Sequence, residues 1–506
     1  MRPKMIRSGQ SPFSVLVAVF IVLFTPMTKG EAEGKEMKAL FLEGRFGSII
    51  RDFSQPAPDT AKEERWIFLK SLILEGELNR AEEYLAELKK SAPTGAGFRV
   101  YEGMLTLARG NIVEAGNIAA ELQKSAGNSD SARQLRFYYE LYRRNFTEAS
   151  AVLSEFRNSM SGFDKSHLFF LMSREFARII KDFPTLSSLY RGRMKSLKKR
   201  ENRDYYENLK LNYKLYKKKQ AHPFRINASK DRIEIPFESG GKGMLKVVPL
   251  NIREKRYTVL LDTGNTAGWL IHSRDLREEL KSVRGGRVVM QVGTESGSLD
   301  GFNIFSRSVK FEDFSIDGLF GAYLPKPRAD FFDANLNPAM LTGRIVSMDY
   351  IHNRLILRSQ ERFDSDISGN RKMNVMKIPW FGFSYPMVPV ICNGKNGLAV
   401  IETGAENISV NIDFAKKLGI PLLPRSKYLS NGKVFKYSLG AVNVQLGKYI
   451  FVRKQAEVWP LLKFRNHLTG FSPHIIIGPE ALAGKFIVTF IPGENIMVFE
   501  YERKNG

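Results

Sequence analysis

Cysteine is almost absent from this chain, which contains only Cys392 among its 506 residues. A single cysteine excludes an intramolecular disulfide and every metal site built from paired cysteines. Cys392 ends an apolar stretch beside Asn393. We therefore expect a buried free thiol there and not a nucleophile.

The sequence also lacks the motifs of several enzyme classes. It contains no His-Glu-x-x-His, no Cys-x-x-Cys, no Gly-x-Ser-x-Gly and no Walker lysine loop. The histidines are scattered without metal-ligand spacing, so each is expected on the surface or satisfied in the core. They are His167, His222, His272, His352, His467 and His474. We therefore expect no metal ion and no organic cofactor.

Acidic residues are outnumbered, with 53 Asp and Glu against 77 Lys and Arg, for a formal net charge of +24. Such an excess favours anionic partners such as a membrane surface, an acidic polymer or nucleic acid. The alternative is a solubilising surface charge without a partner. No base-reading motif accompanies the charge, so we expect no specific nucleic-acid partner.

Long hydrophobic runs are confined to the N-terminus, where an apolar run at 15–24 follows several basic residues and is closed by Pro26. This run is too short for a membrane-spanning helix and is typical of a secretory signal. Residues 1–32 are therefore expected to be a signal peptide, cleaved near Gly30 or Ala32, or an uncleaved anchor. Both alternatives export the rest of the chain to the periplasm or the exterior, and the second attaches it to the membrane.

Residues 36–220 have a helical pattern and almost no strand signals, with prolines between the candidate helices. The segments "LEGELNRAEEYL", "ARGNIVEAGNI" and "YRRNFTEASAVL" repeat one pattern. They place Ala81, Ala115 and Ala149 at successive intervals of 34 residues. A small residue at this position allows two helices to approach closely, so the period predicts repeated helical hairpins.

This helical part resembles a degenerate tetratricopeptide array. Gly76 and Gly110 are expected to end the first helix of their pairs in a left-handed conformation. Pro93 and Gly103 fall at two of the family's positions. The resemblance implies a concave surface that docks a protein partner, and the alternative is a helical spacer that only packs.

The C-terminal part changes to β-branched runs and glycine-rich turns, and it contains a second duplication. "VVPLNIREKRYTVLLDTG" is followed later by "MVPVICNGKNGLAVIETG". Pro249 precedes Asp262 by 13 residues, and Pro389 precedes Glu402 by the same 13. We therefore expect two similar β modules, each with a carboxylate in a tight turn after an apolar strand.

Two further features recur in the same order. "IDGLFGAYL", with Gly321, is expected to correspond to "HIIIGPEAL", with Gly478, and each apolar pair to pack beneath its turn. Closing strand pairs then begin at Gly343 and Gly484. Four matching features in one order indicate a duplicated module.

The arrangement resembles the aspartic protease superfamily, with two retropepsin- or pepsin-like lobes over about residues 240–502. The resemblance implies a multidomain α and β protein in which the helical repeats precede a bilobal all-β acid-protease fold. The expected parts are the N-terminal segment 1–32, the helical domain 36–220, lobe one at 225–360, an interlobe linker at 361–377 and lobe two at 378–506.

By this resemblance Asp262 and Glu402 form a catalytic dyad that shares one proton. The ionised carboxylate acts as general base on a water molecule, and the protonated one polarises the peptide carbonyl. The resemblance therefore implies an aspartic-type endopeptidase acting on a polypeptide substrate.

The resemblance also assigns supporting roles around the dyad. Thr263 and Thr403 are implied to hydrogen-bond across the lobes, and Gly264 and Gly404 to let backbone N–H groups reach the carboxylates. A hairpin at 288–305, with Gly293 and Gly297 at its tip, is the expected flap of lobe one. The segment 432–446 is its counterpart in lobe two.

Two residues depart from the family pattern. Glu402 replaces an aspartate and carries its carboxylate about 1.5 Å further along the side chain. Asn265 replaces the small residue expected after the first Asp-Thr-Gly. Three alternatives therefore stay open: retained hydrolysis, a peptide-binding module that does not cut, and a scaffold that acts only through its helical repeats.

Overall fold

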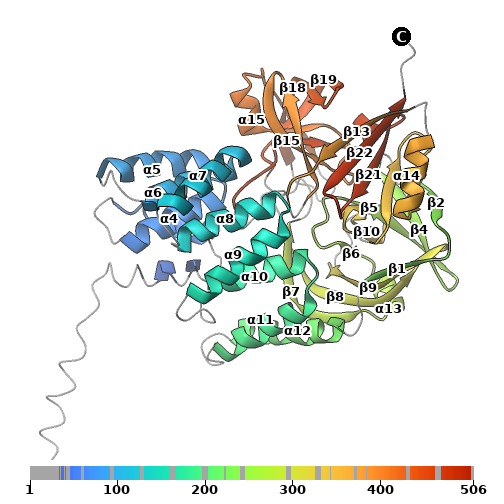
Figure 1. Ribbon diagram of the computed structural model, residues 1–506, viewed down its shortest axis with the longest axis horizontal. Helices are drawn as coiled ribbons and strands as arrows, with labels where there is room; N and C mark the ends of the chain where they lie inside the picture. Colours follow the sequence, from blue (N-terminus) through green and yellow to red (C-terminus); the bar gives the residue numbers. More distant parts are fainter. Residues whose placement is uncertain are drawn as a thin grey trace, which may run out of the picture. The chain divides into compact units, whose positions relative to one another are not determined.

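The computed structural model describes most of the chain from residue 34 to residue 502 (Figure 1). The expected N-terminal signal or anchor at 1–32 lies outside the described residues. The chain divides into two compact units, Met1–Leu72 and Ile73–Gly506. The described ranges are 34, 36–38, 40–41, 46–57, 62–91, 96–125, 130–159, 167–196, 203–220, 224–239, 245–291, 298–324, 332–341, 343–369, 373–382, 385–428, 434–461 and 469–502.

The first unit contains helix α3 (Phe46–Asp52) and most of helix α4 (Lys62–Leu74). Ile49 of α3 and Phe68 and Leu69 of α4 are fully buried. Burial of these apolar side chains is the main driving force that holds such short helices in place.

The second unit begins with paired helices, as the repeat predicts. They are α5 (Leu78–Ser91), α6 (Ala96–Ala108), α7 (Ile112–Ser125), α8 (Asp130–Tyr142), α9 (Phe146–Ser159), α10 (His167–Ile179), α11 (Phe183–Ser196) and α12 (Arg203–Gln220). None of the helices in the described ranges is both long enough and apolar enough to cross a bilayer.

The 34-residue period corresponds to equivalent positions in successive helix pairs. Ala81, Ala115 and Ala149 are all fully buried, where a larger side chain would separate the helices. Gly76 and Gly110 have φ angles of 76° and 79°, which confirms the expected left-handed residues. Arg144 takes the third equivalent position with a φ of 58°, a conformation that disfavours a side chain.

Strands make up the rest of the second unit. The first sheet has the order β3-β4-β5-β10-β6-β9-β8-β7, with β1 paired to β9. The second sheet has the order β14-β15-β20-β16-β19-β18-β17. The third sheet, called the shared sheet below because it joins β11 to β21, has the order β13-β22-β21-β11-β12-β2. The combination of a helical part and a β part is therefore confirmed (Figure 1). The strand bounds are β1 (Arg225–Ala228), β2 (Arg232–Pro236), β3 (Glu238–Ser239), β4 (Lys246–Ile252), β5 (Lys255–Leu261), β6 (Trp269–Ile271), β7 (Val283–Gln291), β8 (Ser298–Lys310), β9 (Phe314–Tyr323), β10 (Ala334–Leu336), β11 (Ile345–Asp349), β12 (Arg354–Arg358), β13 (Met373–Pro379), β14 (Met387–Cys392), β15 (Lys395–Ile401), β16 (Ser409–Asn411), β17 (Leu423–Tyr428), β18 (Val434–Leu446), β19 (Tyr449–Trp459), β20 (Ile475–Ile477), β21 (Phe486–Ile491) and β22 (Ile496–Glu502).

Short helices follow or connect the strands. They are α13 (Arg274–Glu279), the 3-10 helix η3 (Pro338–Met340), α14 (Gln360–Gly369), α15 (Ile412–Lys417) and α16 (Pro479–Leu482). The segment 361–377, expected as a polar linker, contains most of α14 and part of β13. Because β13 pairs with β22, this segment contributes a strand to the shared sheet.

The first and second sheets repeat one local topology. The hairpin β4–β5 in the first sheet corresponds to the hairpin β14–β15 in the second. Strand β10 then pairs parallel to β5, with Leu336 opposite Leu261, and β20 pairs parallel to β15, with Ile477 opposite Ile401. The counterpart of "HIIIGPEALAG" is therefore "DANLNPAMLTG", which begins at Asp333.

This topology corrects the expected match between Gly321 and Gly478. Gly321 lies inside β9, where a Cβ atom would come within 1.8 Å of the Trp269 carbonyl oxygen. Close backbone approach therefore explains that glycine. Asn337 occupies the position that corresponds to Gly478.

The expected closing strand pairs β11–β12 and β21–β22 meet in the shared sheet, where β11 pairs with β21. At this junction the buried Ser347 and Thr489 hydroxyls lie 2.7 Å apart, and the Arg358 guanidinium donates to Ser347 Oγ. Apolar burial and this polar contact connect the two halves of the β part.

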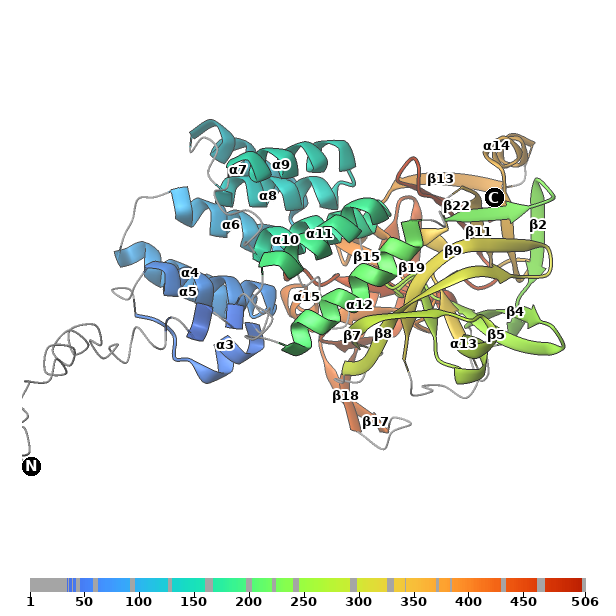
Figure 2. The same ribbon diagram turned by 90° about the horizontal axis from the view of Figure 1, so that it is seen from below.

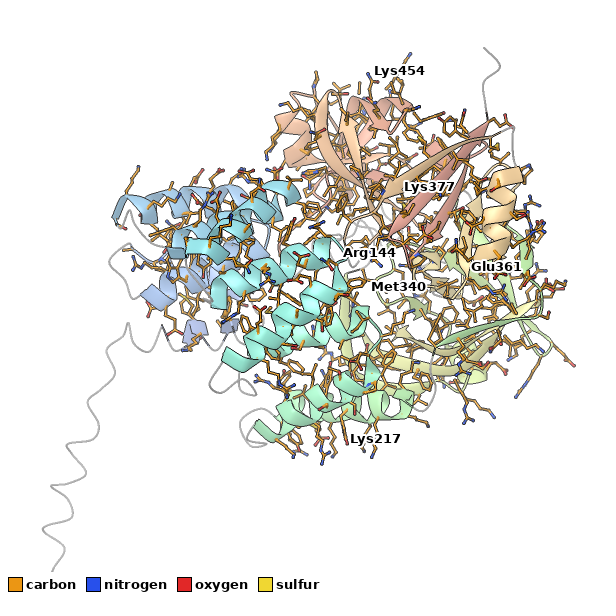
Figure 3. The ribbon with its side chains drawn as sticks, in the orientation of Figure 1. Arg144, Lys217, Met340, Glu361, Lys377 and Lys454 are labelled. Atoms are coloured by element: carbon orange, nitrogen blue, oxygen red, sulfur yellow. The ribbon has the colours of Figure 1, made fainter. Side chains whose placement is uncertain are left out.

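The helical part of the second unit contacts its β part directly. Arg144, labelled in Figure 3, donates from Nε to Asn495 Oδ1 at 2.6 Å. The hydroxyls of Tyr142 and Thr469 are 2.8 Å apart. Helix α12 lies along β7 and β8 in Figure 2. The helical and β parts of this unit therefore form a single compact body.

Candidate functional site

Two equivalent turns carry Asp262 and Glu402 at the ends of strands β5 and β15. Each turn is fixed by the strand beside it. The backbone N–H of Asp262 donates to Leu336 O at 2.9 Å, and that of Glu402 donates to Ile477 O at 3.0 Å. The same hydrogen bond therefore orients both carboxylate-bearing residues.

Thr263 and Thr403 bind the two turns to each other. The N–H of each donates to the hydroxyl of the other, at 3.0 Å and 2.9 Å. The Thr263 hydroxyl donates to Ile401 O at 2.5 Å, and the Thr403 hydroxyl donates to Leu261 O at 2.7 Å. Because both side chains are fully buried, these bonds hold the turns in one arrangement.

The two carboxylates face a common space between the turns. A Cβ atom on Gly264 would lie 1.9 Å from Glu402 Oε2. A Cβ atom on Gly404 would lie 2.6 Å from Asp262 Oδ1 and 2.9 Å from Glu402 Oε1. Each glycine thus leaves room for the carboxylate of the opposite turn, and the predicted residues of both turns are brought together.

The extra methylene of Glu402 does not remove its contact with its own turn. Gly264 N–H donates to Asp262 Oδ1 at 3.0 Å, and Gly404 N–H donates to Glu402 Oε1 at the same 3.0 Å. The glutamate side chain therefore folds back far enough to reproduce the aspartate contact. Glu402 is only 2% exposed, whereas Asp262 is half-buried.

Tyr385, which precedes β14, is a titratable neighbour of both carboxylates. Burial raises the pKa of Tyr385, and the negative charges of Glu402 and Asp262 raise it further. The positive charge of Arg178, on helix α10, acts in the opposite direction on this pKa. The helical part of the second unit therefore contributes to the electrostatics of the site.

Asparagine side chains of β10 and the residue after it donate hydrogen bonds to the first turn. Asn335 Nδ2 donates to Asp262 Oδ2 at 2.6 Å, and Asn335 Oδ1 lies 3.0 Å from His272 Nε2. Asn337 Nδ2 donates to both Thr263 O and Asn265 O at 3.1 Å. This network gives the first turn amide contacts that Gly478, the counterpart of Asn337, cannot make because it has no side chain.

Sequence reasoning missed this asparagine network. Because Gly321 was matched to Gly478, the asparagines of β10 were not predicted as site residues. A signal was present, because Pro338, Leu341 and Gly343 recur with the same spacing as Pro479, Leu482 and Gly484.

The hairpin β7–β8 is the segment expected as a flap, and its tip at 292–297, with Gly293 and Gly297, lies outside the described residues. Its base contacts helix α12. Asn212 Oδ1 accepts from Gly286 N–H at 3.1 Å and from Asn303 Nδ2 at 2.9 Å. The expected counterpart is 432–446; its described part, 434–446, forms β18, which pairs with β14, β17 and β19.

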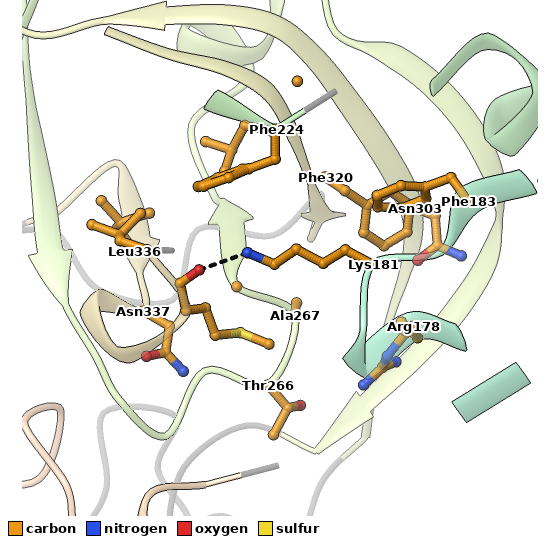
Figure 4. Close-up of a pocket in the computed structure, with 15 residues that line it drawn as sticks. Arg178, Lys181, Phe183, Phe224, Thr266, Ala267, Asn303, Phe320, Leu336 and Asn337 are labelled. Carbon is orange, nitrogen blue, oxygen red and sulfur yellow. Dashed lines mark hydrogen bonds between the residues drawn. The ribbon is translucent and has the colours of Figure 1, made fainter. Parts of the chain in front are cut away.

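A cavity of about 70 Å³ lies beside the first turn, where Thr266 and Ala267 meet residues of α10 and α11 (Figure 4). Lys181 reaches across it and donates to Met340 O at 2.8 Å. Burial, together with the charge of Lys219, lowers the pKa of Lys181 to about 7. Most of the side chains that line the cavity are apolar, and Arg178 and Lys181 are its cationic groups.

Nothing in the described part of the chain gathers three or more His, Cys, Asp or Glu side chains as a metal site requires. Cys392 is buried, and burial raises the pKa of its thiol to about 11.

No family model and no curated relative matches the chain. Among solved structures, it is similar to the crystal structure of a retropepsin-like aspartic protease from Rickettsia conorii, with 18% sequence identity and a TM-score of 0.21. That match covers 26% of this chain and 92% of the other.

Proposed function

We propose that the protein is an aspartic-type endopeptidase that hydrolyses peptide bonds with water activated by Asp262 and Glu402. The observation that carries this proposal is the reciprocal hydrogen bonding of Thr263 and Thr403, which brings the two carboxylate turns together. Two carboxyl groups facing one space can divide the roles of base and acid between them.

Asp262 acts as the general base in this mechanism. Gly264 N–H and Asn335 Nδ2 donate to its two oxygens, and such donors stabilise a charged carboxylate. As the oxygen of the water molecule attacks the carbonyl carbon, Asp262 takes a proton from that water. Glu402, the more buried carboxyl, starts protonated and gives its proton to the carbonyl oxygen. The tetrahedral intermediate then collapses as the C–N bond breaks: the leaving nitrogen takes the proton from Asp262, and one of the two hydroxyls returns its proton to Glu402.

We also propose a fold for the β part, a role for the helix pairs and a role for the N-terminal segment. The β part is a bilobal acid-protease fold in which the first and second sheets are the two lobes, supported by their repeated topology. The helix pairs form a tetratricopeptide-like array that docks a polypeptide substrate or a protein partner, supported by the repeated buried alanines. Residues 1–32 export the chain to the periplasm or the exterior, with membrane attachment if the segment stays uncleaved.

The test is cleavage of a mixed peptide library from about pH 3 to about pH 8, the range in which paired carboxyl groups titrate. The full exported chain and Asp262→Asn are compared, with products identified by mass spectrometry. Cleavage that is lost in the variant supports the proposal.

Absence of cleavage by folded protein would reject the proposal. Peptides retained by that protein would then identify a binding module that does not cut, and retention only through the helices would identify a scaffold.

A further inference from the structure

Asp262 receives a hydrogen bond from a residue of another strand that Glu402 cannot receive from the matching position. Asn335 lies opposite Leu260 in the pairing of β10 with β5. The matching position in the second sheet is Ile476, opposite Val400 in the pairing of β20 with β15. An isoleucine side chain donates no hydrogen bond, so the two turns differ in the polarity of the strand beside them.

The direction of the hydrogen bonds follows from the chemistry of the groups. A charged carboxylate only accepts, so Asn335 presents its Nδ2 group to Asp262 Oδ2 at 2.6 Å. Asn335 Oδ1 is then an acceptor, and His272 Nε2, 3.0 Å away, must carry a proton. Asn265 Nδ2 adds a bond to Asn335 O at 3.2 Å. His272 therefore donates to Asn335, which donates to Asp262.

This chain of donors lies in a dry part of the molecule. Asn335 is 6% exposed and His272 is 3% exposed, so the amide cannot turn towards solvent without losing both partners. Donor chains in such surroundings polarise one another, and each bond is strengthened.

We propose that Asn335, held by His272, is a positioning residue that keeps the Asp262 carboxylate charged and oriented as the base of the dyad. The inference rests on the proposed peptidase function, but its physical content concerns the protonation of Asp262 and can be measured without turnover. It also explains how a dyad with two different carboxylic acids assigns its roles: the aspartate has the additional donor, and the glutamate is the buried acid.

Other titratable groups face Asp262 and must be kept in the comparison. Among the described residues these are Glu402 of the second turn, Tyr385 ahead of β14 and, behind Asn335, His272. None of them is altered by a substitution at Asn335.

The test measures the titration of Asp262 in the full chain by carbon-13 NMR of aspartate side-chain carboxyls, with the signal assigned by its absence in Asp262→Asn. Asn335→Leu keeps a side chain of similar size, removes the donor and adds no titratable group, and Asn335→Ile copies the second sheet. Both variants are expected to move the Asp262 titration midpoint upwards by about one to two pH units, the equivalent of one charge-assisted hydrogen bond.

The same variants are then assayed for peptide cleavage. The pH midpoint of the acidic limb of the kcat/KM profile should increase by the same amount as the NMR midpoint. KM at higher pH should stay close to that of the unaltered chain. His272→Gln, which keeps an N–H donor, should retain the original midpoint, whereas His272→Leu should move it partway.

The outcomes separate the two proposals. An unchanged Asp262 midpoint in folded Asn335→Leu and Asn335→Ile overturns the positioning role, whatever the activity. A raised midpoint in a chain that cleaves nothing supports the positioning role and rejects only the peptidase function.

Discussion

Glu402 and Asp262 occupy equivalent turns but different environments. Glu402 is almost fully buried, and Asp262 is half-buried with amide donors on both of its oxygens. A neutral acid is the cheaper form to bury, and a charged base needs donors. In the proposed mechanism, the environment of each residue and not the length of its side chain assigns the roles of acid and base.

The glycines of the two turns give a residue-scale prediction. Gly264→Ala would place a methyl group 1.9 Å from Glu402 Oε2, so the carboxyl group must move. A displacement near 1 Å costs about a hundredfold in rate where geometry governs the step. We therefore expect kcat to fall by about this factor, measured with a cleaved peptide.

The matched control is Gly369→Ala at the end of α14. A Cβ atom there meets no heavy atom within 4 Å. This variant should keep the activity of the unaltered chain. Full activity in Gly264→Ala would contradict the position we assign to Glu402.

Residue types in short motifs were accessible from the sequence, and long-range partners were not. The triplets at Asp262 and Glu402 are local patterns, and the structure brings both turns together. Asn335 and His272 are distant from Asp262 along the chain, and only the pairing of β10 with β5 and β6 makes them neighbours. No local sequence pattern predicts such a contact.

The β10 strand shows why an element-scale pattern misled. An apolar pair followed by glycine fits "GLFG" in β9, because any buried strand beside a close backbone contact has this composition. The true counterpart, "ANLN", carries two asparagines that a hydrophobicity pattern rejects. The side chains of these asparagines hydrogen-bond to the turn itself. Hydrophobic periodicity does not predict such hydrogen bonds.

Helix α12 should restrain the hairpin β7–β8. Asn212 is 4% exposed, and its Oδ1 accepts from Gly286 N–H and Asn303 Nδ2. Asn212→Leu leaves both donors without this acceptor and should cost about 1–3 kcal/mol. We expect faster amide hydrogen exchange in β7 and β8, measured by mass spectrometry.

Lys217→Ala is the control on the same helix, because Lys217 is exposed (Figure 3). Its exchange pattern should match that of the unaltered chain. Equal exchange in Asn212→Leu would mean that the helix does not restrain the hairpin.

At the scale of the whole second unit, His474 joins the helices to the β part. Its Nδ1 accepts from Leu398 N–H at 3.0 Å, and its Nε2 donates to Arg109 O at 3.1 Å. Burial lowers the pKa of His474 to about 4. Protonation of Nδ1 would remove the bond from Leu398, so the folded unit requires the neutral ring.

This requirement predicts a loss of stability in acid. The unfolded chain binds a proton at His474 near pH 6.5, and the folded chain only near pH 4. The free energy of unfolding should therefore be highest above about pH 6.5 and fall as the pH decreases towards 4, by about 3 kcal/mol from this group. Urea unfolding at a series of pH values measures it.

His474→Gln keeps an acceptor and a donor but does not titrate. It should show a flatter pH dependence over this interval than the unaltered chain. Identical slopes in the unaltered chain and His474→Gln would contradict the assignment.

We propose that Asp262 and Glu402 act as one catalytic unit, and a double-mutant cycle on kcat/KM separates this mechanism from one in which each residue acts alone. Asp262→Asn, Glu402→Gln and the double variant are compared with the unaltered chain, with folding checked by thermal unfolding. We predict that each single variant loses at least about a hundredfold and that the double variant loses no more than the worse single one. Activity of Glu402→Gln within about tenfold of the unaltered chain, or additive losses in the double variant, would contradict the claim.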